Sequence, residues 1–149
     1  MKKLLIVSAL MLGLTQCKKE DAKAPDPEFN AANVAGTYKI TGLVITAGGI
    51  DQDVYATQYP ACNKDDNHIF TAAGNYTLMD IGLQCTPPTA TVTGTYSVIA
   101  TPSKKITFNG KTYEVVTFTA LSMVVSENIR VTVGTNTFDA VQKLTLTRQ

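Results

Sequence analysis

Apolar and polar residues alternate along most of the chain after residue 33, which is the pattern of β-strands with one buried face. Ile106 and Phe108, for example, alternate with Lys105 and Thr107. Threonine, valine, isoleucine and tyrosine, which favour strands, are abundant in these segments. No stretch after Leu14 has a convincing helical period. The pattern predicts about eight strands, at residues 36–47, 66–71, 75–83, 91–100, 104–109, 111–118, 120–133 and 136–148.

Short turns separate the predicted strands. Asn109-Gly110 is the strongest hairpin signal, because both residues tolerate the positive φ angles of a type I′ turn. Ala72-Ala73-Gly74 fits a three-residue hairpin loop with glycine at the left-handed position. Sequential antiparallel strands joined by such turns favour an up-and-down barrel, since closure removes exposed edges. We therefore predict an all-β, antiparallel barrel of about eight strands.

The first 16 residues have the pattern of a secretory signal peptide. Lys2-Lys3 give a positive start, and Leu4 to Leu14 give about eleven mostly apolar residues. This run is too short to span a membrane, which takes roughly 20 apolar residues. We expect residues 1–16 to be removed and the protein to be exported.

The residues around Cys17 indicate a lipid anchor. Leu14-Thr15-Gln16-Cys17 resembles the bacterial lipobox, although glutamine stands where that motif prefers a small residue. The resemblance implies that Cys17 receives diacylglycerol; the alternative is a plain signal peptide with an incidental cysteine. Cys17 and the following Lys-Lys-Glu-Asp are similar to the starts of lipoproteins from Bacteroidota, where acidic residues near the cysteine direct export to the cell surface. This implies attachment to the outer membrane, with surface exposure as one outcome.

The composition of the remaining residues indicates a tether, a single domain and no strong net charge. Residues 17–32 are charged, contain Pro25 and Pro27, and read as a flexible tether. Residues 33–149, about 117 in number, are enough for one domain. The formal net charge is +1 and the charges are scattered, so no nucleic-acid partner is expected.

With Cys17 assigned to lipid, Cys62 and Cys85 remain as an even pair in an exported protein. A hairpin that pairs Thr71 with Asn75 places position 62 opposite position 84, one residue from Cys85. A small bulge or a frayed end would bring the two sulfurs together. We therefore predict a disulfide between Cys62 and Cys85 at the open end of this hairpin.

Several segments together resemble the lipocalin-like lipoproteins of Bacteroidota. Gly36-Thr37-Tyr38 looks like the lipocalin opening Gly-x-Trp, with tyrosine in place of tryptophan. Pro60-Ala61-Cys62-Asn63-Lys64-Asp65-Asp66, then Phe70, Gly74, Cys85 and Gly94-Thr95-Tyr96, extend the similarity over most of the domain. The resemblance implies a calyx-like barrel on a lipid tether, without an assigned ligand or catalytic residue.

One local cluster contains nucleophilic and metal-binding residue types, namely Cys62, Asp65, Asp66 and His68. A thiol and an imidazole can form a nucleophile and a base. A disulfide-bonded Cys62 cannot attack a substrate, however, and His68 is the only histidine in the chain. The cluster also lacks the ligand spacings of zinc sites and calcium loops. We predict that the protein is not an enzyme and holds no metal or cofactor.

Side chains on the inner faces of the strands are the candidates for a ligand site: Tyr38, Ile40, Tyr96, Val98, Tyr113, Met123 and Phe138. Core packing explains the same residues without a ligand, because a barrel of eight strands either packs its own side chains or holds one small molecule. Two functions follow. The first is an anchored protein that binds or carries a small apolar or amphipathic molecule. The second is a surface-displayed structural or interaction module that contacts an envelope protein or glycan, for which the long connection at residues 47–67 offers a recognition loop.

Overall fold

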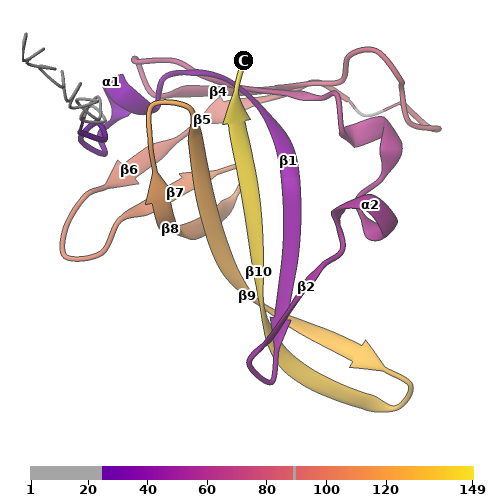
Figure 1. The fold of residues 1–149 in the computed structure, drawn as a ribbon. Coiled ribbons are helices and arrows are strands. Elements are labelled where there is room, and N and C mark those ends of the chain that lie inside the picture. The colour runs from indigo at the N-terminus through magenta and orange to yellow at the C-terminus, as the bar shows by residue number, and fades with distance from the viewer. Residues whose placement is uncertain (1–24, 89) are drawn as a thin grey trace, which may run out of the picture.

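The computed structural model describes residues 25–88 and 90–149 and has one antiparallel sheet of ten strands. The predicted all-β class is confirmed, although the sheet has ten strands instead of about eight. Residues 50–53 form an additional strand, and the predicted strand at residues 91–100 divides in two (Figure 1). The strands are β1 (Gly36–Ala47), β2 (Ile50–Asp53), β3 (Asn67–Phe70), β4 (Asn75–Met79), β5 (Val92–Thr95), β6 (Ser97–Ile99), β7 (Lys105–Phe108), β8 (Lys111–Phe118), β9 (Ser122–Val133) and β10 (Asn136–Arg148).

The sheet nearly closes into a barrel at Tyr96. The strand order is β5-β4-β3-β1-β10-β9-β8-β7-β6, and β2 pairs with the outer part of β1. The two strands at the ends of this path, β5 and β6, are separated in sequence by Tyr96 alone. The Tyr96 N–H donates to the Gly74 carbonyl at 2.8 Å, and its hydroxyl lies 2.8 Å from the Thr71 carbonyl. One bent strand therefore pairs with β4 through its first half and with β7 through its second half.

The predicted hairpin registers are confirmed. His68 faces Leu78 and Phe70 faces Tyr76, as the pairing of Thr71 with Asn75 requires. Asn109 and Gly110 both have positive φ, at 50° and 72°, in the turn between β7 and β8. β4 ends at Met79, so the predicted strand at residues 75–83 is too long, and the chain continues from Asp80 as a loop.

The structure has three short helical segments that the sequence pattern did not predict. α1 (Ala31–Val34) precedes β1, whereas α2 (Tyr55–Gln58) and the 3₁₀ helix η1 (Ala61–Asn63) lie between β2 and β3. The Asn30 side chain caps α1 by accepting the Asn33 N–H at 2.9 Å. Val34 of α1 is the one residue that these three segments bury.

The folded domain includes part of the predicted tether. Phe29 is 2% exposed and packs edge-on against Phe118, with ring centroids 5.3 Å apart. Val34 is fully buried beside it in the same core. The boundary predicted at residue 33 is therefore too late, because Phe29 closes the end of the barrel at which the chain enters. We call this the closed end.

Candidate functional site

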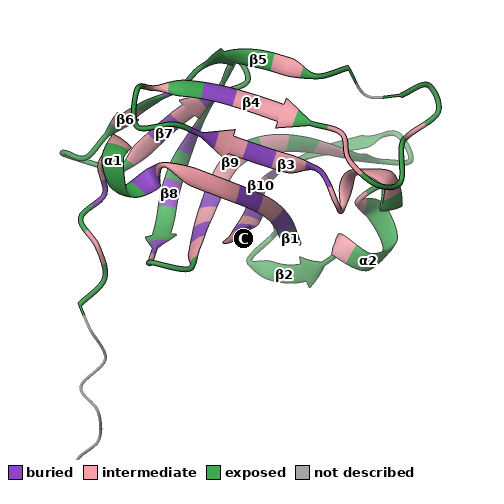
Figure 2. Ribbon diagram, turned by 90° about the horizontal axis from the view of Figure 1, so that it is seen from above, coloured by how far each residue is buried: buried purple, intermediate pink, exposed green. Residues whose placement is uncertain are grey.

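Many of the side chains that are buried inside the barrel are aromatic. Figure 2 shows in purple where the buried residues lie along the strands. Phe70 on β3 lies 5.3 Å from Phe108 on β7, 5.1 Å from Tyr96 and 5.7 Å from Tyr38 on β1, measured between ring centroids. β1 is the neighbour of β3, but β7 is not, so the rings of Phe70 and Phe108 meet across the interior. Side chains of the protein itself occupy the space that a deep ligand cavity would need here.

The residues predicted to line a ligand site differ in their burial. Tyr38, Ile40, Tyr96, Tyr113 and Met123 are buried in this core, and Val98 is partly buried against it. Phe138 is 51% exposed, so its prediction as an interior residue is wrong. It is on the same face of β10 as buried Ala140, but it pairs with Val131 where β9 and β10 have run past the barrel. The alternation of apolar and polar residues predicts on which face of the sheet a side chain lies. It does not predict how far along the strand the barrel extends.

A polar layer lies next to the aromatic core. His68 is buried, and its Nδ1 lies 3.0 Å from the Tyr76 hydroxyl. Burial lowers the pKa of His68 to about 4, because the charged imidazolium loses its hydration. Burial raises the pKa of Tyr113 to about 12, with a further increase from the Glu127 carboxylate. The tyrosines and His68 are therefore neutral at physiological pH.

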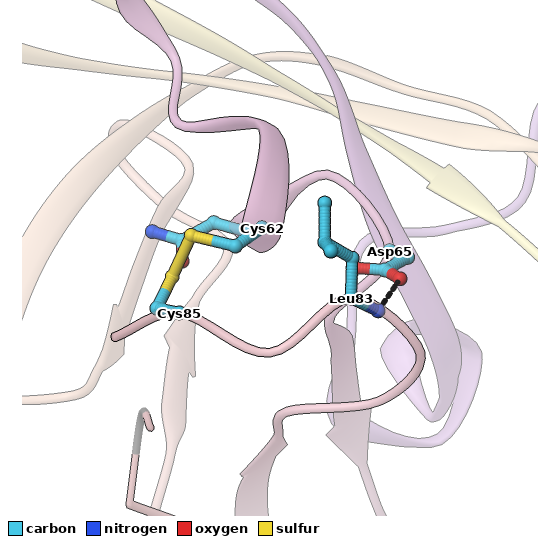
Figure 3. The surroundings of a disulfide bond; sticks show 5 residues. Cys62, Asp65, Leu83 and Cys85 are labelled. Carbon is cyan, nitrogen blue, oxygen red and sulfur yellow. Dashed lines mark hydrogen bonds between the residues drawn. A yellow bond between two sulfur atoms is a disulfide. The ribbon is translucent and has the colours of Figure 1, made fainter. Parts of the chain in front are cut away.

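The predicted disulfide is present between Cys62 and Cys85, with a Cα–Cα distance of 5.1 Å (Figure 3). It joins η1 to the loop after β4. In the same region Asp65 Oδ2 accepts the Leu83 N–H at 2.7 Å. The disulfide and this hydrogen bond hold together the two loops that flank the β3–β4 hairpin. They are structural contacts that hold the segment before β3 against the loop after β4.

Three carboxylates lie within these two loops, namely Asp65, Asp66 and Asp80. Asp66 is buried, and burial raises its pKa, with further increases from the charges of Asp80 and Asp65. The Ile81 N–H opposes this rise by donating to the Asp66 side chain. Within the described residues, no group of three histidine, cysteine or carboxylate side chains is arranged to hold a metal ion.

A pocket of about 380 Å³ lies where β8 and β9 separate. The two strands pair only as far as Glu114 and Ser126. Beyond this pair, Lys111 Nζ reaches across to Glu127 Oε1 at 3.1 Å, and the Gln142 amide lies 3.4 Å from the same oxygen. The pocket is polar and open at the side of the barrel; its lining comprises Lys105, Thr112, Tyr113, Glu114, Ser126, Glu127, Asn128 and Val141.

Beyond the barrel, four strands continue as a projecting sheet, which we call the wing. It consists of β2, residues 44–47 of β1, residues 128–133 of β9 and residues 136–143 of β10. Figure 1 shows the β9–β10 hairpin extending away from the rest of the sheet at the end opposite α1. Ile50, Val133 and Phe138 are 67%, 65% and 51% exposed on the wing. A pocket of about 550 Å³ lies beside it, between the β1–β2 turn and the β9–β10 hairpin.

Sequence reasoning missed the wing as a separate feature. The predicted strands at 120–133 and 136–148 are longer than the others, and this length is the signal that would have found it.

Cys17 and the signal peptide lie outside the described residues. Among the residues that are described, no helix is both long and apolar enough to cross a bilayer. Neither a protein-family model, nor a curated protein, nor a solved structure matches this chain.

Proposed function

We propose that this protein is a lipid-anchored interaction module of the bacterial cell envelope, in which the barrel is a packed scaffold and the wing carries the binding surface. The observation that carries the proposal is the wing itself, where Ile50, Val133 and Phe138 stay exposed although the chain has a core to bury such residues. Exposed apolar side chains grouped on a projecting element are typical of binding surfaces.

The position of the wing supports the same function. The segment after the proposed anchor at Cys17 enters the domain at Phe29, at the closed end. β9 starts at that end and has 12 residues, so its far end lies about 36 Å away along the strand at 3.3 Å per residue. An anchor at Cys17 would therefore hold the closed end near the membrane and present the wing away from it.

Site-specific photocrosslinking in the bacterium that encodes the protein tests this function. A benzoylphenylalanine at Phe138 reports on the wing, and the same probe at Val116, which is 56% exposed on β8, reports on the barrel wall. We expect a discrete adduct from position 138 and none from position 116. Equal labelling at both positions, or none at 138, would count against the wing as a binding surface. Metabolic labelling with a clickable palmitate, compared with Cys17→Ser, tests the anchor separately.

A second candidate is the binding of a small amphipathic molecule, favoured by the side pocket between β8 and β9. Because aromatic side chains fill the barrel interior, less space remains for a ligand than in a barrel with a deep cavity. Native mass spectrometry of the purified protein with fatty acids and isoprenoids tests it. A stoichiometric complex that Glu127→Gln weakens would favour this candidate over the interaction module.

A further inference from the structure

The wing has an unpaired strand edge. β9 pairs with β10 over its whole length, from Ser122 to Val133, without a break in register. Its pairing with β8 stops at Ser126. In the described part of the chain, residues 128–133 therefore have a neighbouring strand on one side only. An edge of this kind presents backbone N–H and C=O groups that another strand can bind.

The register shows which groups face outward. The Arg148 N–H donates to the Leu121 carbonyl at 2.8 Å, which makes this facing pair of β10 and β9 a hydrogen-bonded one. Bonded pairs alternate with non-bonded pairs in an antiparallel ladder. The odd-numbered residues of β9 thus bond to β10, and the backbone groups of Asn128, Arg130 and Thr132 point to the free side.

Features that usually protect an edge are missing from this one. Residues 128–133 contain no proline, lysine or β-bulge. The only charge among them is Arg130, and its Nε lies 3.3 Å from the Asp139 carboxylate on β10, which offsets the charge. The edge therefore carries little net charge, so it does not repel a neutral strand and does not favour a strongly charged one.

We propose that this edge pairs antiparallel with the same edge of a second copy of the chain, about a two-fold axis at Val131. In this register Val131 faces its own copy and Ile129 faces Val133, so apolar side chains meet on one face. On the other face Arg130 lies opposite Thr132. The outward backbone groups of these even-numbered residues also meet each other, as the ladder requires. A register centred on Arg130 would instead place two arginines directly opposite, which is unfavourable.

If the proposed function is correct and Cys17 carries a lipid, the pairing also determines how the two anchors lie relative to each other. An antiparallel pair reverses the direction of β9 in the second copy. Because β9 runs from the closed end toward the wing, the two closed ends lie at opposite ends of the dimer. At each closed end the proposed tether joins its own domain at Phe29. The pair therefore joins two facing membranes instead of two neighbours in one membrane.

Analytical ultracentrifugation of the exported, unlipidated Cys17→Ser protein tests the pairing. We expect a monomer–dimer equilibrium that Thr132→Pro weakens at least tenfold. Proline removes an outward N–H without breaking the β9–β10 ladder, and Thr132→Val, which keeps that N–H, serves as the matched control. Val131→Lys is a second disrupting variant, since it places two like charges opposite each other. A monomer at all concentrations, or a dimer unaffected by both disrupting variants while circular dichroism shows a native fold, overturns the proposal.

Light scattering tests the geometry with lipidated protein in phosphatidylethanolamine–phosphatidylglycerol vesicles. We expect the protein to cluster vesicles and Thr132→Pro to abolish clustering. Dimers in solution without vesicle clustering would overturn the facing-membrane arrangement. A monomeric protein that still crosslinks another protein through position 138 would overturn self-pairing and leave the proposed interaction module standing.

Discussion

The Arg148 guanidinium near the C-terminus lies over the ring of Tyr38 on the first strand, with its central carbon 5.0 Å from the ring centroid. Its Nη2 donates to the Tyr38 hydroxyl at 2.6 Å, and its Nη1 donates to the Ala35 carbonyl at 2.8 Å. Tyr38 in turn donates to the Val34 carbonyl at 3.0 Å. One side chain thus joins the last strand, the first strand and the segment that includes α1, and so fixes the closed end of the barrel.

Arg148→Ala should lower the free energy of unfolding by about 2 to 3 kcal/mol, since hydrogen bonds from a charged donor are lost. Arg148→Lys should recover only part of this loss, because lysine lacks the planar fork that reaches several acceptors. Urea denaturation of both variants, and of each combined with Tyr38→Phe, measures the coupling between the two side chains. Full stability in Arg148→Lys would show that charge alone is sufficient.

Phe29 and Phe138 form a matched pair of tests for where the core lies. Phe29→Ala should cost about 3 to 5 kcal/mol, as for other buried aromatic residues. Phe138→Ala should change stability by less than about 1 kcal/mol, because the ring is 51% exposed. Thermal denaturation of the two variants measures the difference. A larger loss for Phe138→Ala than for Phe29→Ala would contradict the described core.

These two residues also show what the sequence can predict. Alternation and turn chemistry identified the strands, the β3–β4 register and the Asn109-Gly110 turn, because these depend on local periodicity. The place of Phe138 depends on how far β10 extends past the barrel, which periodicity does not contain. Phe29 had a local signal that was missed: Asn30 caps α1, so Phe29 and Val34 occupy the two positions of a hydrophobic staple.

The candidate site was less predictable for a similar reason. The disulfide followed from the register of one hairpin, so spacing was sufficient to predict it. The free edge of β9 depends on where β8 stops pairing, at Ser126, although the predicted strands are continuous there. The sequence pattern predicts which residues form a strand. It does not predict which of these residues have a paired strand on both sides.

Replacing both cysteines of the disulfide with serine should lower the free energy of unfolding by about 3 kcal/mol. This is the loss expected for a crosslink between residues separated by 23 positions, because the unfolded chain regains conformational freedom. Guanidinium denaturation of the Cys62→Ser, Cys85→Ser protein measures the loss. Treatment of the double variant with dithiothreitol is the control and should cause no further change. Unaltered stability in the double variant would mean that the loops are held by other contacts.

His68 should make the protein sensitive to mild acid. Its pKa is lowered to about 4 in the folded state, so between the ordinary value of 6.5 and 4 the unfolded chain takes up a proton that the folded chain does not. Stability should therefore fall as the pH decreases through this window, by about 3 kcal/mol in full. Since the chain has one histidine, its imidazole signals in the NMR spectrum give the folded pKa directly. His68→Gln should remove this part of the pH dependence; a folded pKa near 6.5 would contradict it.

Asp66 and Asp51 should respond to pH in opposite directions. Burial, Asp80 and Asp65 raise the pKa of Asp66, so its ionisation as the pH rises above about 4 destabilises the folded state. Asp66→Asn should thus raise the melting temperature at pH 7. It should have little effect at pH 3, where the protonated Asp66 side chain is as neutral as the asparagine that replaces it.

The hydrogen bond from Thr46 lowers the pKa of Asp51, with a further contribution from Lys143. Its stabilising contribution is present at pH 7 and decreases as the pH falls, so Asp51→Asn should lower the melting temperature slightly at pH 7. Calorimetry of both variants from pH 3 to pH 7 compares them, and a lower melting temperature for Asp66→Asn at pH 7 would show that its contact with the Ile81 N–H outweighs the repulsion among the carboxylates.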